Sequence, residues 1–105
     1  MKIPFDQGTP VPLRRRLHPH RVDTAAERGW SRLENGDLMQ KAEDEGYEAL
    51  GTTDQNIRYQ QNLSGRRIRL LVLMTTSWPK IQPKADSVRE LLERMDPGTY
   101  MEFEC

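Results

Sequence analysis

The sequence has little of what cross-links small secreted domains and little of what crosses membranes. Its one cysteine, Cys105, cannot form an internal disulfide, so covalent cross-links do not hold the fold and a reducing compartment is expected. The longest apolar run, residues 70–74, is far too short to span a bilayer. Residues 1–10 do not resemble a signal peptide, because Pro, Asp and Gly interrupt them early. We therefore predict a cytoplasmic protein with no membrane segment.

Net charge is also missing. Sixteen basic side chains balance sixteen acidic ones, so the whole molecule gives no electrostatic reason to expect a polyanionic partner, although local patches can still bind one. The 105 residues suffice for one modest hydrophobic core and are too few for two. We therefore predict a single domain over residues 1–105.

Apolar segments alternate with amphipathic ones, which predicts alternating strands and helices. We expect strands at residues 2–5, 20–26, 47–53 and 67–76. The unbroken apolar middle of 67–76 is typical of a strand buried on both faces of a parallel sheet. A half-exposed edge strand should follow at residues 98–105, where a period of two sets one group of side chains against another: Tyr100, Glu102 and Glu104 against Met101, Phe103 and Cys105.

Three segments between these strands have helical patterns. Residues 9–18 offer Thr9 as N-cap and Pro10 at the first helical position, and residues 35–46 offer Asn35 as N-cap and Gly46 as terminator. Residues 78–95 form one apolar face, made of Ile81, Ala85, Val88, Leu92 and Met95. The alternation predicts an α/β protein, a three-layer α/β/α sandwich around a mainly parallel sheet of about five strands.

Two acids follow predicted strands directly. Asp6 comes directly after the first strand, and Asp54 comes directly after residues 47–53, which are expected to form the third. Ligand sites of open parallel sheets gather outside the carboxyl ends of the strands, near a switch in strand order. We therefore expect Asp6 and Asp54 at one edge of the sheet. The sequence leaves open on which edge Glu34, Asn35 and Asp37 lie.

Two stretches carry a resemblance to a known family. The sequences "FDQGTPVPLRRRL" (5–17) and "AAERGWSRLENGDLMQKAEDEGYEALGTTDQN" (25–56), followed by an apolar strand, resemble the PIN-like domains, in particular the small stand-alone group of predicted toxins of toxin–antitoxin systems. The resemblance covers nearly the whole chain. The positions that match the family pattern are Asp6, the "ENGD" segment 34–37 and the "TTD" triplet 52–54.

The resemblance implies a metal-dependent ribonuclease whose site is built from carboxylates and holds Mg²⁺ or Mn²⁺. Asp6, Asp54 and Asp37 are then the catalytic candidates, and Asp6, Asp54 and Asn35 are the candidate metal ligands. RNA would be the substrate, a cognate antitoxin protein a partner, and a homodimer a further option. The chain departs from the family in two places: Asn35 is uncharged, and Gln55 and Asn56 stand where many PIN-like sequences carry a further acid.

The chemistry also has a reason that does not depend on the family. Mg²⁺ prefers hard oxygen ligands and is commonly held by one or two carboxylates, several waters and a substrate phosphate. Asp6 and Asp54 would suffice as a minimal pair. A bound ion lowers the pKa of its water and stabilises charge at a scissile phosphate. Without an ion, repulsion between the two carboxylates raises the pKa of one of them.

The segment after Asp54 is polar but poor in turn formers. Arg58, Tyr59 and Gln60 are expected at the rim of the site, where they would contact RNA phosphates and bases; the alternative is a solvated surface helix. Thr76 and its neighbours after the fourth strand either line the same pocket or cap the helix near Pro79, and capping is the favoured interpretation.

Other patterns have both functional and structural interpretations. The basic clusters 14–21 and 66–69 could hold a nucleic-acid backbone or simply be solvated. His18 and His20 are interpreted as surface residues, and the two tryptophans as core or interface anchors. Two other functions stay open. One is a PIN-like scaffold that has lost catalysis and binds RNA or a protein. The other is a phosphoacceptor domain, which requires a second acid beside the first-strand Asp and a Lys after the last parallel strand.

Overall fold

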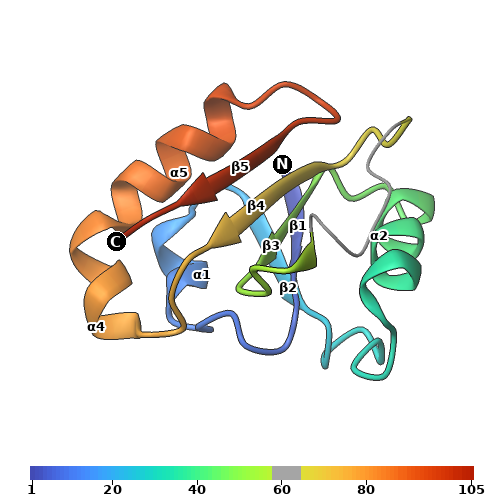
Figure 1. The fold of residues 1–105 in the computed structure, drawn as a ribbon, viewed down its shortest axis with the longest axis horizontal. Coiled ribbons are helices and arrows are strands. Elements are labelled where there is room, and N and C mark those ends of the chain that lie inside the picture. The colour runs from blue at the N-terminus through green and yellow to red at the C-terminus, as the bar shows by residue number, and fades with distance from the viewer. Residues whose placement is uncertain (58–64) are drawn as a thin grey trace.

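Five parallel strands form one sheet in the structure, a computed structural model that describes residues 1–57 and 65–105 (Figure 1). The strand order is β2-β1-β3-β4-β5, and every neighbouring pair is parallel. The strands are β1 (Lys2–Phe5), β2 (Arg21–Thr24), β3 (Ala49–Thr52), β4 (Arg69–Leu73) and β5 (Tyr100–Phe103). The predicted α/β class with a mainly parallel sheet is confirmed.

Helices cover both faces of this sheet. They are α1 (Leu13–Arg16), α2 (Asn35–Asp44), α4 (Trp78–Ile81), the 3₁₀ helix η1 (Gln82–Lys84) and α5 (Ala85–Arg94). Figure 1 shows α1, α4 and α5 on one side of the strands and α2 on the other. No helix in residues 1–57 and 65–105 is both long and apolar enough to cross a membrane.

The core is divided by the sheet into two clusters, because successive side chains of a strand point to opposite faces. Leu71 and Leu73 of β4 pack with α1, α4 and α5, whereas Leu70 and Val72 pack with α2. Strand β4 is therefore buried on both faces, as its apolar run predicts. The arrangement is compatible with the expected three layers.

Two predicted helix caps are wrong. Helix α1 begins at Leu13 and not at Pro10, because the Thr9 hydroxyl contacts Asp6 and the Gly51 carbonyl and caps no helix. Helix α2 has Glu34 at its cap position, and the Asn35 side chain donates to Asp54. In both cases a tertiary hydrogen bond takes the place of the local one.

The helix predicted at 78–95 is three elements. Pro83 has no N–H and its ring crowds the carbonyl four residues earlier, so the α-helix gives way to η1 between α4 and α5.

At the edge strand, Phe103 packs against one core cluster and Tyr100 against the other, as the alternation predicts. Met101 of the same strand is 41% exposed, which agrees with a half-exposed edge strand.

Candidate carboxylate site at the carboxyl edge of the sheet

The strand order changes direction between β1 and β3. From β1 the chain passes to β2 on one side, and then returns to build β3, β4 and β5 on the other. The loops after β1 and β3 therefore diverge and leave a crevice where ligands bind in open parallel sheets. Phe5 pairs with Gly51, and the Asp6 N–H donates to the Gly51 carbonyl at 3.2 Å, so the two loops start side by side.

Asp6 lies in this crevice, with a hydroxyl group on each carboxylate oxygen. The Thr9 hydroxyl donates to Oδ1 at 2.7 Å, and the Thr52 hydroxyl donates to Oδ2. Burial raises the pKa of Asp6, and the hydrogen bonds from Thr52 and Thr9 partly offset that effect; the nearby charge of Asp54 raises the pKa further. Asp6 and Asp54 are therefore close enough to repel each other, as strand-end placement predicts.

Thr52 joins the two acids. Its buried Oγ1 donates to Asp6 and accepts the backbone N–H of Asp54 at 3.0 Å. One side chain at the end of β3 therefore orients the first carboxylate and the loop that carries the second. The "TTD" triplet is visible in the sequence, but the sequence alone does not indicate that its first threonine, Thr52, joins the two acids.

Asp54 is held from the other side by the start of α2. Asn35 Nδ2 lies 2.5 Å from Asp54 Oδ2, and the Asn56 N–H donates to Oδ1 at 2.9 Å. Asn35 is the first residue of α2, so the partial positive charge of the helix N-terminus also lies near this carboxylate. The loop after β1, the loop after β3 and the start of α2 thus converge on one site.

Gly8 permits the tight return of the chain from Asp6 to Thr9. Its φ is +121°, and an added Cβ would lie 2.7 Å from Thr53 Oγ1. Only glycine meets both conditions without strain. Beside this turn, a hollow of about 160 Å³ opens against Asp6, Gln7, Trp30 and Asn35. The hollow leaves room for a small ligand at the Asp6 carboxylate.

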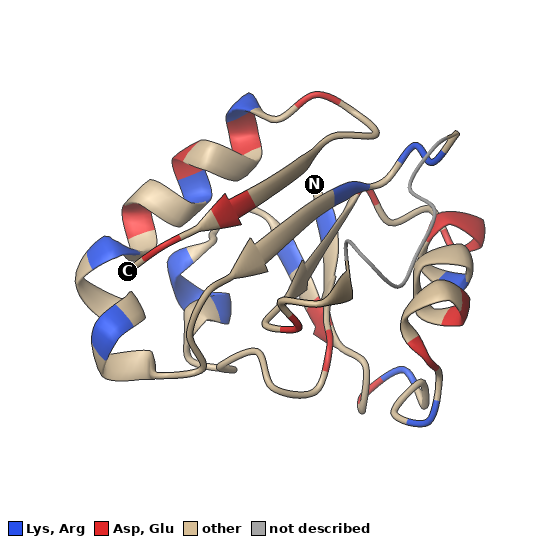
Figure 2. Ribbon diagram, viewed as in Figure 1, with Lys and Arg blue, Asp and Glu red and all other residues tan. Residues whose placement is uncertain are grey.

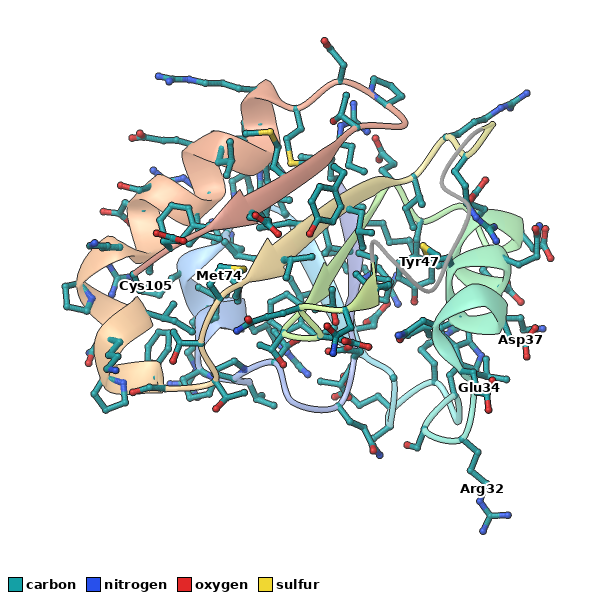
Figure 3. All side chains as sticks on the ribbon, viewed as in Figure 1. Arg32, Glu34, Asp37, Tyr47, Met74 and Cys105 are labelled. Atoms are coloured by element: carbon teal, nitrogen blue, oxygen red, sulfur yellow. The ribbon has the colours of Figure 1, made fainter. Side chains whose placement is uncertain are left out.

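The structure does not bring every predicted site residue to this point. Asp37 is exposed on α2, and its side chain points away from the sheet (Figure 3). Thr76 is exposed, and its neighbour Thr75 accepts the Ser77 N–H at 3.1 Å, while Ser77 occupies the cap position of α4. The predicted substrate residues Arg58, Tyr59 and Gln60 lie outside the described residues.

The oxygen donors at the site fit a sparse Mg²⁺ or Mn²⁺ site. Within residues 1–57 and 65–105, no group of three or more His, Cys, Asp or Glu side chains gathers into a metal cage. Asp6 and Asp54 supply two carboxylates and the Thr52 hydroxyl supplies a neutral oxygen, whereas the Asn35 amide turns its nitrogen toward Asp54. Such a set suits an ion that keeps several waters and completes its shell with a substrate phosphate.

Much of the predicted basic clusters is used within the chain. Arg14 forms a two-point ion pair with Glu27, with distances of 2.7 and 3.2 Å. Arg66 pairs with Glu43 at 3.2 Å, and Arg69 donates to the Met95 carbonyl at 2.7 Å. These arginines tie elements together and are not available for phosphate in this arrangement.

The residue that follows Asp6 is Gln7, so the second acid that a phosphoacceptor site needs at the end of the first strand is absent.

Comparison of the chain with family models, with curated proteins and with solved structures finds no match in any of the three.

Proposed function

We propose that the protein is a Mg²⁺- or Mn²⁺-dependent endoribonuclease, which hydrolyses phosphodiester bonds at Asp6 and Asp54. One observation carries the proposal: Asp6 and Asp54 come from separate loops at the switch point of a parallel sheet and are joined by the Thr52 hydroxyl, which donates to the Asp6 carboxylate and accepts the Asp54 N–H. The likeness of residues 5–17 and 25–56 to PIN-like domains supports the same chemistry. Asp37 is exposed on α2 with its side chain pointing away from the sheet, so it has no part in the proposed reaction.

Each residue of the site has a defined task in this proposal. Asp6 and Asp54 are the anionic ligands, and Thr9 and Thr52 hold the Asp6 carboxylate in a fixed orientation through its two oxygens. Asn35 holds Asp54 and, with its amide turned over, presents a neutral oxygen to the same point. A bound divalent ion supplies Lewis acidity and a water of lowered pKa at neutral pH.

Cleavage of RNA tests the proposal directly. Purified protein is expected to cut a mixed single-stranded RNA pool in Mg²⁺ or Mn²⁺ and to leave it intact in EDTA, because the two carboxylates need an ion to act on phosphate. Gel analysis of end-labelled RNA gives the readout. Cutting that persists in EDTA would contradict the metal-dependent mechanism, and an intact pool with either metal would contradict the nuclease.

A second function is favoured by one observation, which is that protein donors already occupy the oxygens of both carboxylates. Asp6 accepts from two hydroxyls, and Asp54 accepts from the Asn35 amide and the Asn56 N–H. A PIN-like scaffold that binds RNA or a protein without cutting would need these carboxylates only for their hydrogen bonds within the chain, and not as metal ligands. Folded protein that binds RNA but leaves it intact with either metal is the result that selects the scaffold.

The proposed biological setting follows from the resemblance. A small ribonuclease of this kind acts in the cytoplasm as the toxin of a toxin–antitoxin pair, held in check by a cognate antitoxin protein. A homodimer is compatible with this setting.

A further inference from the structure

A second hollow lies between α1 and α4, outside the carboxylate site. Its volume is about 630 Å³, and its walls combine apolar and cationic side chains. Val11, Pro12 and Trp78 form the apolar part, and the three arginines of α1 form the cationic part. We call this hollow the α1–α4 groove. It differs from a core cavity because a row of arginines borders it.

The elements around the groove carry positive charge without any acid of their own. Residues 7–22 and 74–85 contain no Asp or Glu, and the charged residues of α1, α4 and η1 are all Lys or Arg (Figure 2). The balance of charge over the whole chain hides this local excess. The groove therefore offers a site for an anionic ligand that the net charge of the protein does not suggest.

The three arginines differ in how far they are available. Arg14 is held by Glu27. Arg16 lies 3.4 Å from Asp86, but both side chains are well exposed, at 39% and 64%, so solvent screens the pair. Arg15 is exposed and makes no ion pair within the described part of the chain. Arg15, with Arg16 as a second contact, can therefore bind phosphate at small cost.

The apolar side of the groove also remains open. Val11 is 53% exposed, whereas most large apolar side chains in the described residues are buried. Trp78 is half-buried: one part packs against the core, and another part lines the groove. The sequence alone indicated only an anchoring role for this tryptophan. An indole face beside exposed guanidinium groups is the combination that binds unpaired bases and their phosphates.

The groove adjoins the carboxylate site. Val11 follows Thr9, whose hydroxyl contacts Asp6, by two residues, so the two Cα atoms lie within about 8 Å of each other. Trp78 follows β4 and lies, like Asp6 and Asp54, beyond the carboxyl end of a strand. A strand of RNA that extends across this edge can contact both places.

We infer that the α1–α4 groove binds single-stranded RNA, with a base on Trp78 and phosphates on Arg15 and Arg16. The inference rests on the proposed function for the choice of RNA, because the groove borders carboxylates suited to phosphodiester chemistry. It adds the path by which that substrate reaches them. An acidic protein segment is the other occupant that the charge would accept, and the test separates the two.

Binding is measured without cleavage, by fluorescence anisotropy of a labelled single-stranded RNA of about twelve nucleotides in EDTA. Arg15→Glu is expected to weaken binding about tenfold. The slope of the logarithm of the binding constant against the logarithm of the salt concentration should also become shallower, by about 0.7 for each phosphate that the protein no longer neutralises. Arg94→Glu is the matched control, since Arg94 is an exposed arginine at the end of α5 with no ion pair in the described residues. Its binding should stay at the wild-type level.

The stacking face needs a pair of variants, because Trp78 also packs against the core. Trp78→Leu keeps an apolar side chain and is expected to weaken RNA binding about five- to tenfold, whereas Trp78→Phe keeps a ring and should retain most of it. Equal binding by the leucine and phenylalanine variants, with both folded by circular dichroism, would overturn the stacking interaction.

The outcomes separate the groove from the nuclease. If the protein cleaves RNA in Mg²⁺ and its RNA binding is unchanged by Arg15→Glu and Trp78→Leu, the proposed function stands and RNA binding in the groove is refuted. An acidic protein segment is then the better candidate for the groove. If RNA binding falls in both groove variants but the protein cuts no RNA, RNA binding in the groove is supported and the nuclease is refuted. Wild-type protein that binds no RNA in EDTA overturns the inference.

Discussion

Replacing Asp6 by asparagine should reduce RNA cleavage by about 100-fold or more and, at neutral pH, should make the fold more stable. Cleavage falls because an uncharged amide is a poor ligand for a hard divalent cation. Stability rises because burial and the Asp54 charge oppose ionisation of Asp6 in the folded state. Both effects come from one carboxylate, so activity assays and thermal melts of the same variant measure them together.

The pH dependence of the melts fixes the sign of this effect. The pKa of Asp6 is raised on folding above its ordinary value of 3.8. The group therefore contributes its full stability below the unfolded pKa and loses that contribution as the pH rises through the folded pKa. The stability gained by Asp6→Asn should be present at pH 7 and should shrink as the pH falls toward 4.

Asp37→Asn is the matched control for this experiment. It makes the same chemical change at an exposed acid that points away from the sheet. Cleavage and stability should both stay close to wild type. An Asp6→Asn variant that melts below wild type at pH 7 would contradict the origin of the raised pKa, and full activity in that variant would contradict the role of Asp6 in the reaction.

Thr52→Val should destabilise the protein by about 1–3 kcal/mol, although valine matches threonine in shape. The Thr52 hydroxyl is fully buried, and its removal takes away the donor to Asp6 and the acceptor of the Asp54 N–H. The pKa of Asp6 should also rise further, because the hydrogen bond from Thr52 lowers it in the wild type. Denaturant unfolding gives the first quantity, and NMR titration of the carboxyl carbon gives the second.

Thr53→Val provides the comparison for Thr52→Val. Thr53 is the next residue, is half-buried and reaches Asp6 through its backbone, which valine retains. Its substitution should cost much less than that of Thr52. Equal unfolding free energies for the two variants would show that the bridge between the acids adds nothing to stability.

The strands and the meeting of the two acids could be predicted because they depend on short-range pattern and on one rule of topology. Apolar runs located β1 and β4, and the strand-end rule placed Asp6 and Asp54 on one edge. The roles of Thr9 and Asn35 could not be predicted in this way. Each is a good helix cap by residue type, and only the tertiary fold offers it a carboxylate instead.

The spacing of apolar residues did not predict where the helix is interrupted, because it carries no information about the backbone. The apolar spacing of residues 78–95 continues through Pro83, which interrupts the helix without changing which side chains face the core. The basic clusters were ambiguous for a different reason. The partner of Arg16 is seventy residues away, so no local pattern distinguishes it from Arg15, which has no ion pair in the described ranges. The PIN-like resemblance, with its ribonuclease activity and antitoxin, stays a prediction.

Binding of Mn²⁺ tests most directly whether Asp6 and Asp54 share a cation. Electron paramagnetic resonance of free Mn²⁺ during titration counts bound ions independently of any cleavage, and it is applied to wild type, Asp6→Asn, Asp54→Asn and the Asp37→Asn control. We expect one saturable ion per chain in wild type and in Asp37→Asn, and none in either of the other variants. Saturable binding that survives both Asp6→Asn and Asp54→Asn, or no binding by wild type at millimolar Mn²⁺, would contradict the shared site.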